Sequence, residues 1–216
     1  MPNSAVQQFI HEHLDADPQQ LLLAAHRYPG IPMPFVASQL QALRKVRDKI
    51  PTWYDPALEF PVQLSVEQAS SERTARFKAS LFSGQRMADL TGGMGVDAWA
   101  WAQHFAEVIY LEQNEALVAA ARHNFQVLGI KNITCRQGEA EAFLQAIHVS
   151  HLDLIYLDPA RRDGQQRKVF RLEDCQPNVV ALRTNLLAKA PQVLVKTAPL
   201  LDLKLAARQL AAVSHI

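Results

Sequence analysis

The chain of 216 residues is long enough for one domain, or for one domain with a small addition. Hydrophobic residues make up 49% of it and charged residues 20%, which excludes a disordered or collagen-like chain. Because 22 basic side chains nearly balance 21 acidic ones, a nucleic-acid partner would need a local basic patch. Two cysteines without C-x-x-C spacing, and the lack of a signal or membrane-spanning segment, predict a cytoplasmic protein.

The first 64 residues are predicted to form a helical N-terminal domain that ends in an extended connector. Apolar residues recur at helical spacing in three segments, which precede a connector containing Pro56 and Pro61. The sequence Ser65-Val66-Glu67-Gln68 fits a capping box, so we expect one helix from Ser65 to about Phe82. The helices expected in this half of the chain cover residues 6–14, 21–23, 35–50 and 65–82.

From Arg86 onward, short apolar runs alternate with helix-length segments. This alternation is typical of β-α-β units, so we predict an α/β fold with a Rossmann-like parallel sheet. The expected strands are residues 87–90, 108–111, 133–135, 154–157 and 193–195, and the expected helices are 96–105, 114–128, 139–147 and 179–188. Ligands bind such sheets beyond the carboxyl ends of the strands, so the residues that follow the strands are the candidates for a site.

Four of the expected strands are followed by motifs that suit a nucleotide-like cofactor. The sequence Asp89-Leu90-Thr91-Gly92-Gly93-Met94-Gly95 leads into a helix, and its glycines allow a tight turn and a close approach of a ligand. Glu112 could accept two ribose hydroxyls, or be a solvated charge near a helix start. Glu139 could face an adenine edge, or be a favourable acid in a helix first turn. Asp158-Pro159 places a carboxylate and rigid backbone carbonyls beside the glycine loop.

These motifs, in this order, resemble the class I S-adenosylmethionine-dependent methyltransferases. They are most similar to the nucleic-acid-modifying branch, whose last motif reads Asp/Asn-Pro-Pro-aromatic. The motifs that carry the resemblance are D-L-T-G-G-M-G, L-E-Q-N, Q-G-E-A and Y-L-D-P-A-R, and it covers Ser65 to Ala198. The chain also resembles a bacterial group that joins such a domain to a helical N-terminal region and a THUMP-like RNA-binding module.

The resemblance implies an S-adenosylmethionine-binding catalytic domain over residues 65–216 and RNA, either rRNA or tRNA, as the substrate. Asp89 would orient the amino-acid part of the cofactor, while Glu112 would hold its ribose and Glu139 its adenine end. Asp158 and Pro159 would be the catalytic residues and hold the base amine that is methylated. The remaining cofactor-binding candidates are Thr91, Gly93 and Gly95 in the glycine loop, with Gln68, Ser71 or Thr74 on the preceding helix.

Two residues depart from the family pattern. Ala160 replaces the second proline, and Arg161 stands where an aromatic side chain would stack on the target base. The base therefore needs another platform, either the guanidinium plane of Arg161 or the ring of Phe170. Hydrogen bonds from the amine to Asp158 and to the carbonyl of Pro159 would still favour attack by the nitrogen.

The segment after the Asp-Pro motif is basic, and we expect it to contact RNA phosphates. The alternative is a solvated loop whose arginines pair with Glu173 and Asp174. Lys196 ends the fifth expected strand near Asp158, where it would pair with that carboxylate, meet a substrate phosphate or extend to solvent. The substrate-binding candidates are Arg161, Arg162, Arg167, Lys168 and Lys196.

Two other functions fit parts of the sequence. Residues 93–98 match G-x-G-x-x-A and are followed by the acid Glu112, as in an NAD(P)-binding oxidoreductase. The second alternative is a catalytically inactive, methyltransferase-like RNA-binding module. Cys175 invites comparison with carbon-5 pyrimidine methyltransferases, although a small buried side chain also explains it.

No metal site is expected, because His148 and His151 lack a convincing third ligand. The sequence stops after a helical stretch over residues 201–210, where the family would supply two further strands. We therefore expect a five-stranded sheet whose closing strands are missing, that is, a truncated catalytic domain.

Overall fold

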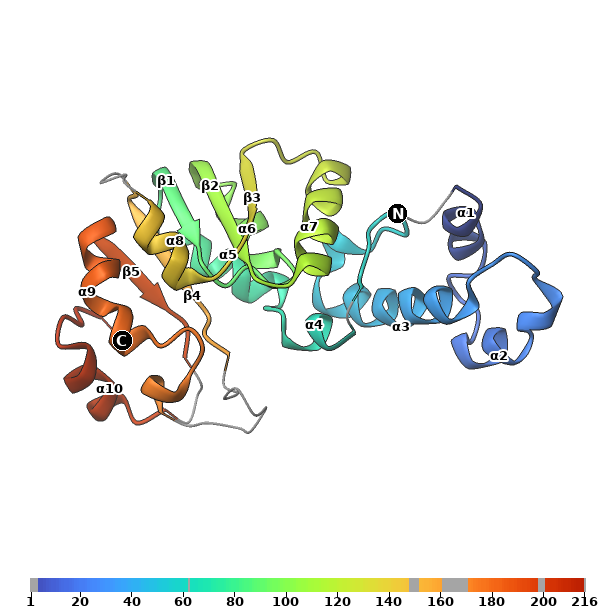
Figure 1. The fold of residues 1–216 in the computed structure, drawn as a ribbon. Helices are drawn as coiled ribbons and strands as arrows, with labels where there is room; N and C mark the ends of the chain where they lie inside the picture. The colour runs from blue at the N-terminus through green and yellow to red at the C-terminus, as the bar shows by residue number, and fades with distance from the viewer. Residues whose placement is uncertain (1–3, 62, 148–151, 161–170, 198–200, 216) are drawn as a thin grey trace.

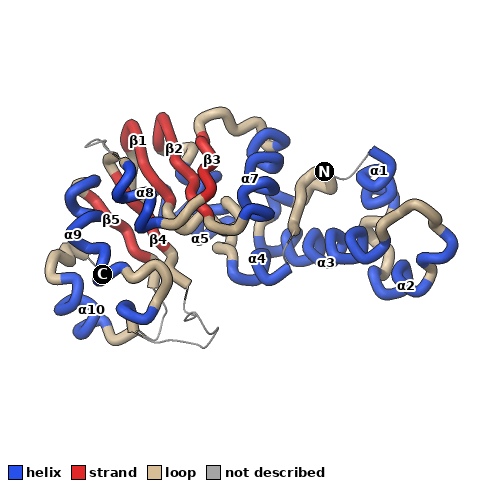
Figure 2. The backbone as a smooth tube through the Cα atoms, in the orientation of Figure 1, coloured by secondary structure: helices blue, strands red, loops and turns tan. Residues whose placement is uncertain are grey.

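A computed structural model describes residues 4–61, 63–147, 152–160, 171–197 and 201–215. Five parallel strands form one sheet in the order β3-β2-β1-β4-β5, and helices lie around it (Figures 1 and 2). The strands are β1 Gly84–Asp89, β2 Phe105–Glu112, β3 Ile133–Gln137, β4 Leu154–Leu157 and β5 Gln192–Val195. The predicted α/β fold, with its five parallel strands and helical N-terminal region, is confirmed.

The helices agree with the expected pattern in most places. Three lie in the N-terminal region, two more lead into β1, and the rest alternate with the strands or follow β5. They are α1 Ser4–Glu12, α2 Pro18–Leu23, α3 Met33–Lys49, α4 Gln63–Gln68, α5 Glu72–Ser80, α6 Val96–Trp101, α7 Glu115–Val127, α8 Ala140–Ala146, α9 Val179–Lys189 and α10 Leu203–Leu210. Short 3-10 turns occur at Ala25–Arg27, Pro51–Trp53 and Leu172–Asp174.

Two of the expected helices differ from the structure: one is broken into two helices, and the other ends earlier than predicted. The single helix over residues 65–82 is wrong, because the chain breaks between α4 and α5. Ser71 is the N-cap of α5, and its hydroxyl accepts a hydrogen bond from the amide of Thr74 at 3.2 Å. A serine side chain that bonds the backbone as an N-cap disfavours a helix that continues through that serine. The cap therefore lies at Ser71 and not at Ser65. The helix expected to reach residue 105 ends at Trp101, because Phe105 already begins β2.

The sheet is covered on both faces, as successive side chains of each strand point to opposite sides. Met87 and Val108 pack in the cluster that contains residues of α5, α6 and α7. Ala88 and Ile109 pack in a second cluster with residues of α8 and α9. A sheet buried on both faces explains why its strands appear in the sequence as short, nearly continuous apolar runs.

The N-terminal helices share the first of these clusters with the sheet. The ring of Trp53 is fully buried and makes an edge contact with Trp99, with the ring centroids 6.4 Å apart. The connector after it is extended, and side-chain amides from two helices hold its backbone. Gln39 of α3 bonds both the N–H and the carbonyl of Phe60, and Asn124 of α7 does the same at Glu59. The connector therefore runs between α3 and α7.

Candidate active site

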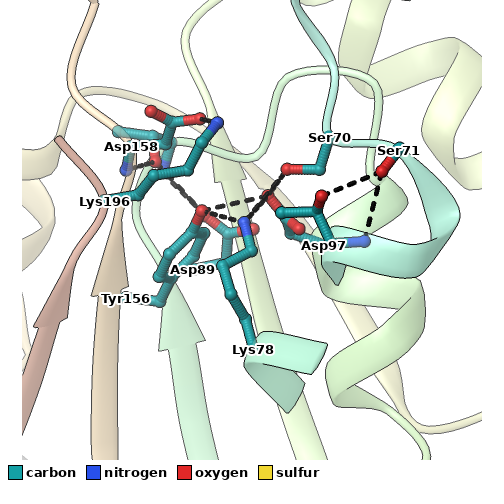
Figure 3. A network of polar contacts seen from close by, with 10 residues as sticks. Ser70, Ser71, Lys78, Asp89, Asp97, Tyr156, Asp158 and Lys196 are labelled. Atoms are coloured by element: carbon teal, nitrogen blue, oxygen red, sulfur yellow. Dashed lines mark hydrogen bonds and ion pairs between the residues drawn. The ribbon is translucent and has the colours of Figure 1, made fainter. Parts of the chain in front are cut away.

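The glycine loop and the Asp-Pro corner lie on the same rim of the sheet. β1 and β4 are parallel neighbours, so Asp89 and Asp158 both follow the carboxyl ends of adjacent strands. Thr91 joins the two ends directly, because its hydroxyl oxygen accepts a hydrogen bond from the amide of Asp158 at 2.7 Å. Its own amide donates to Oδ1 of Asp89 at 3.0 Å. The glycine loop and the Asp-Pro corner therefore lie next to each other, and Figure 3 shows Asp89 and Asp158 in the same region.

Glu112 closes the glycine loop from the neighbouring strand. One carboxylate oxygen accepts a hydrogen bond from the amide of Gly93, and the other accepts one from the amide of Asn114, each at 2.9 Å. The hydroxyl of Tyr110 donates to the carbonyl of Gly93 at 2.6 Å. The loop is thus tied to β2 on both sides of Gly93, which fixes its shape.

Two features favour glycine at position 95: its backbone conformation and the close packing of a neighbouring ring. It has a φ of +90°, and a Cβ there would lie 2.7 Å from the ring of Phe125. Gly129 is a matched control, since its φ is +70° and a Cβ would meet nothing within 4 Å.

Gly95→Ala should therefore lower the free energy of unfolding by about 2–5 kcal/mol, from backbone strain and overpacking together. Gly129→Ala should cost only about 1–2 kcal/mol, because it adds the backbone strain alone. Urea unfolding of both variants measures the difference, and equal losses would contradict the steric contribution of Phe125.

Asp89 is the most unusual titratable group at the rim. Its side chain is fully buried, and its Oδ2 atom accepts no hydrogen bond from the described residues. Burial raises its pKa from 3.8 to about 8, and the negative charges of Asp97 and Asp158 act in the same direction. In the absence of a cationic partner, the carboxyl group therefore holds a proton at neutral pH.

This raised pKa predicts a specific pH dependence of stability. Between pH 4 and 8 the folded chain binds a proton at Asp89 that the unfolded chain has released. The free energy of unfolding should therefore fall as the pH rises through this interval. Asp89→Asn removes the titrating group, so its free energy of unfolding should not fall in this way. The difference in stability between Asp89→Asn and wild type should therefore shift in favour of the variant from pH 4 to pH 8. Thermal melts across that range test this, with the exposed Asp174→Asn as the control; parallel curves for Asp89→Asn and wild type would refute it.

A buried polar network lies beside Asp89 and was not predicted from the sequence. The ammonium of Lys78 lies 2.8 Å from Oδ2 of Asp97 and donates to Ser70 at 3.0 Å and to the hydroxyl of Tyr156 at 2.5 Å. The hydroxyls of Ser70 and Tyr156 each donate to the same Oδ2 atom at 3.0 Å. Figure 3 shows this network between α5, α6 and β4, next to the rim.

The sequence gives little sign of this network, because Asp97 also has an ordinary local explanation. Asp97 lies in the first turn of α6, where an acid is favourable for the helix alone. Lys78 is the one signal in the sequence, because it shares the apolar side of α5 with Ala75 and Ala79. A lysine in an apolar stripe is rarely buried without a counter-charge.

Asp158 has a cationic partner in this structure. Its carboxylate forms an ion pair with Lys196, and both side chains are about one-third exposed. β5 adjoins β4, and the amide of Lys196 donates to the carbonyl of Leu157 at 2.8 Å. Of the three positions considered for Lys196, the structure has the ion pair with Asp158.

Comparisons with known proteins agree with this geometry. A family model described as RNA cap guanine-N2 methyltransferase matches residues 84–183. A candidate methyltransferase from Porphyromonas gingivalis W83, known from its crystal structure, superimposes with a TM-score of 0.77 at 31% sequence identity, over 92% of this chain and 49% of that one. The sheet and its helices thus have the Rossmann-like fold of the class I S-adenosylmethionine-dependent methyltransferases.

Two curated relatives carry related names. An uncharacterized S-adenosylmethionine-dependent methyltransferase of Mycobacterium tuberculosis is 28% identical over 139 residues, which cover 64% of this chain and 36% of that protein. An uncharacterized RNA methyltransferase of Streptomyces avermitilis is 32% identical over 92 residues, 41% of this chain and 21% of that protein. The chain described here thus matches well under half the length of these relatives.

The other residues predicted to form the site differ in burial and in hydrogen bonding. Pro159 is buried after Asp158, whereas Glu139 is exposed as the N-cap of α8, and no described residue hydrogen-bonds its side chain. The hydroxyls of Ser71 and Thr74 lie 2.9 Å apart at the start of α5, and Gln68 is exposed at the end of α4. The candidates outside the described residues are Arg161, Arg162, Arg167, Lys168 and Phe170.

Cys175 is close to the Asp-Pro corner in the fold. The next residue, Gln176, forms an antiparallel bridge with Ala160, with backbone hydrogen bonds of 2.7 and 3.1 Å. The thiol is buried and donates to the carbonyl of Arg171 at 3.3 Å. Within the described ranges there is no cluster of three or more metal-binding side chains, and every helix is too short or too polar to span a bilayer.

Proposed function

We propose that this protein transfers the methyl group of S-adenosylmethionine to a base amine of RNA. The proposal depends on one observation, the meeting of the glycine loop and the Asp158-Pro159 corner on a single rim, bridged by Thr91. The family and the fold support methyl transfer, and the name of the matching family supports an RNA base amine.

The residues of the rim fit this cofactor. Asp89 offers a buried carboxylate oxygen without a described donor, which suits the ammonium of the cofactor's amino-acid part. A Cβ at Gly93 would meet nothing closer than 3.9 Å, so the loop leaves open space at that position. Glu112 lies beside the loop at the end of β2, where a carboxylate can accept the ribose hydroxyls. Glu139, after β3, would lie toward the adenine.

Asp158 and Pro159 would act on the substrate. The base amine is a poor nucleophile because its lone pair is delocalised into the ring. Hydrogen bonds from its N–H groups to Asp158 and to the carbonyl of Pro159 favour the pyramidal nitrogen and hold it in line. When bound, the cofactor supplies a methyl group on a sulfonium. The new nitrogen–carbon bond then forms as the carbon–sulfur bond breaks, the electron pair of that bond stays on sulfur, and the nitrogen releases a proton.

Lys196 and the base amine would share the carboxylate of Asp158. The ammonium pairs with Oδ2, so the amine would bond the same carboxylate beside Lys196. An RNA phosphate near this corner would also meet the positive charge of Lys196. The arginines and lysine of residues 161–168 would add further phosphate contacts, and coupling to a THUMP-like RNA-binding module is proposed on the resemblance alone.

The test combines cofactor binding with methyl transfer. Quenching of tryptophan fluorescence should occur with S-adenosylhomocysteine and not with NAD, which distinguishes a methyltransferase from an oxidoreductase. Labelled S-adenosylmethionine should then transfer its methyl group to total RNA, and mass spectrometry of the nucleosides should find it on a base nitrogen. Cofactor binding without transfer to any RNA would support the inactive RNA-binding module instead.

A further inference from the structure

Two carboxylate oxygens beside the glycine loop accept no hydrogen bond from the described residues. They are Oδ2 of Asp89 and Oδ1 of Asp97, and both atoms are buried. Asp89 is fully buried, and the side chain of Asp97 is 12% exposed. A buried acceptor that is left unpaired destabilises the folded protein, and a charged one does so more. Two of them in one place favour a ligand that brings N–H donors and a positive charge.

The charges at this end of the sheet have the same implication. The carboxylates of Asp89, Asp97 and Asp158 lie close enough that the last two raise the pKa of Asp89. Two of these carboxylates have ion pairs: Asp97 with the ammonium of Lys78, and Asp158 with that of Lys196. Asp89 has no ion pair among the described residues, so the positive charge of a ligand there would favour its ionised form over the protonated one. The surrounding side chains, Ser70, Tyr110 and Tyr156, are neutral donors.

Asp97 is held in a way that a purely structural ion pair does not need. Its Oδ2 atom alone receives three donors: Lys78 from α5, Tyr156 from β4 and Ser70 from the break before α5. Burial and the charge of Asp97 raise the pKa of Tyr156, so its hydroxyl stays protonated and donates. The other oxygen, Oδ1, accepts no hydrogen bond from the described residues and can accept one from a ligand. Asp97 is also two residues beyond Gly95, at the N-terminus of the helix that the glycine loop opens.

We propose that Asp97 is a second ligand, beside Asp89, for the primary ammonium of the cofactor's amino-acid part, and that Lys78, Ser70 and Tyr156 are positioning residues that hold Asp97. This inference rests on the proposed function. An ammonium has three N–H donors, so one group can bond both free oxygens. Because Asp89 is fully buried, binding includes displacement of the atoms that cover it.

The experiment compares two ligands that differ in the amino-acid part. S-adenosylhomocysteine has the ammonium, whereas 5′-methylthioadenosine has the same adenosine and sulfur without it. Calorimetric titration of Asp97→Asn should show S-adenosylhomocysteine binding weakened about 10- to 100-fold, the loss expected for a charge-assisted hydrogen bond. Binding of 5′-methylthioadenosine should stay within about twofold of wild type. Asp89→Asn should give the same selective loss, and Tyr156→Phe a smaller one.

Each outcome decides the matter. If Asp97→Asn binds both ligands like wild type, or weakens both equally, Asp97 has only a structural role and the inference is overturned. If Asp97→Asn does not fold, the selective loss must appear in Tyr156→Phe, which keeps the buried charges, or the inference fails. Failure of the wild type to bind either ligand would instead overturn the proposed function and this inference with it.

Discussion

Asp158→Asn should reduce methyl transfer to RNA by about 100- to 1,000-fold, the usual cost of removing one oriented group that acts in the transition state. Asparagine keeps the shape of the side chain but turns one acceptor into a donor, which would face the N–H of the base amine. The ion pair with Lys196 is lost in the same variant. The loss should appear in kcat, measured with labelled S-adenosylmethionine.

Binding of S-adenosylhomocysteine separates catalysis from folding in this experiment. Asp158→Asn should bind it within about threefold of wild type, because none of the proposed cofactor contacts comes from Asp158. Asp15→Asn is the matched control, since its side chain is exposed between α1 and α2 in the N-terminal region, and it should retain full activity. Retention of activity by Asp158→Asn would remove this residue from the chemistry.

The positions of the strand ends could be predicted because they depend on the local pattern of apolar and polar residues. Parallel strands buried on both faces appear as short apolar runs, and the polar residue after each run marks the rim. Asp89, Glu112 and Asp158 were placed correctly from this rule alone, since it needs no knowledge of long-range contacts. Neighbouring strand positions also predicted that Lys196 would lie near Asp158.

The buried network could not be predicted, for a physical reason. Lys78 and Tyr156 are 78 residues apart in the chain, and they meet only because α5 packs beside β4 in the folded protein. The sequence shows a lysine in an apolar stripe, but it does not show which carboxylate balances the charge. The break between α4 and α5 was missed for a local reason. The capping-box pattern at Ser65 suggested one helix start, whereas α4 begins at Gln63 and Ser71 caps a second helix, α5.

The network also predicts the largest effect on stability. Lys78→Met should lower the free energy of unfolding by about 3–5 kcal/mol, because it leaves the carboxylate of Asp97 buried without its cation. Methionine fills a similar volume, so lost packing contributes little. The hydroxyls of Ser70 and Tyr156 would still donate to Asp97, but neither carries a charge. Urea unfolding at neutral pH measures the loss.

Two further variants distinguish a buried charge from a general defect. Lys45→Met breaks an ion pair with Glu67 in which both side chains are exposed, so its stability should remain close to wild type. Lys78→Met combined with Asp97→Asn removes both charges, and it should recover a large part of the loss, because the cost of Lys78→Met alone is that of an uncompensated carboxylate. If the double variant is as unstable as the sum of the single ones, the two side chains are not coupled. Lys78 would then not be the residue that holds Asp97 beside the glycine loop.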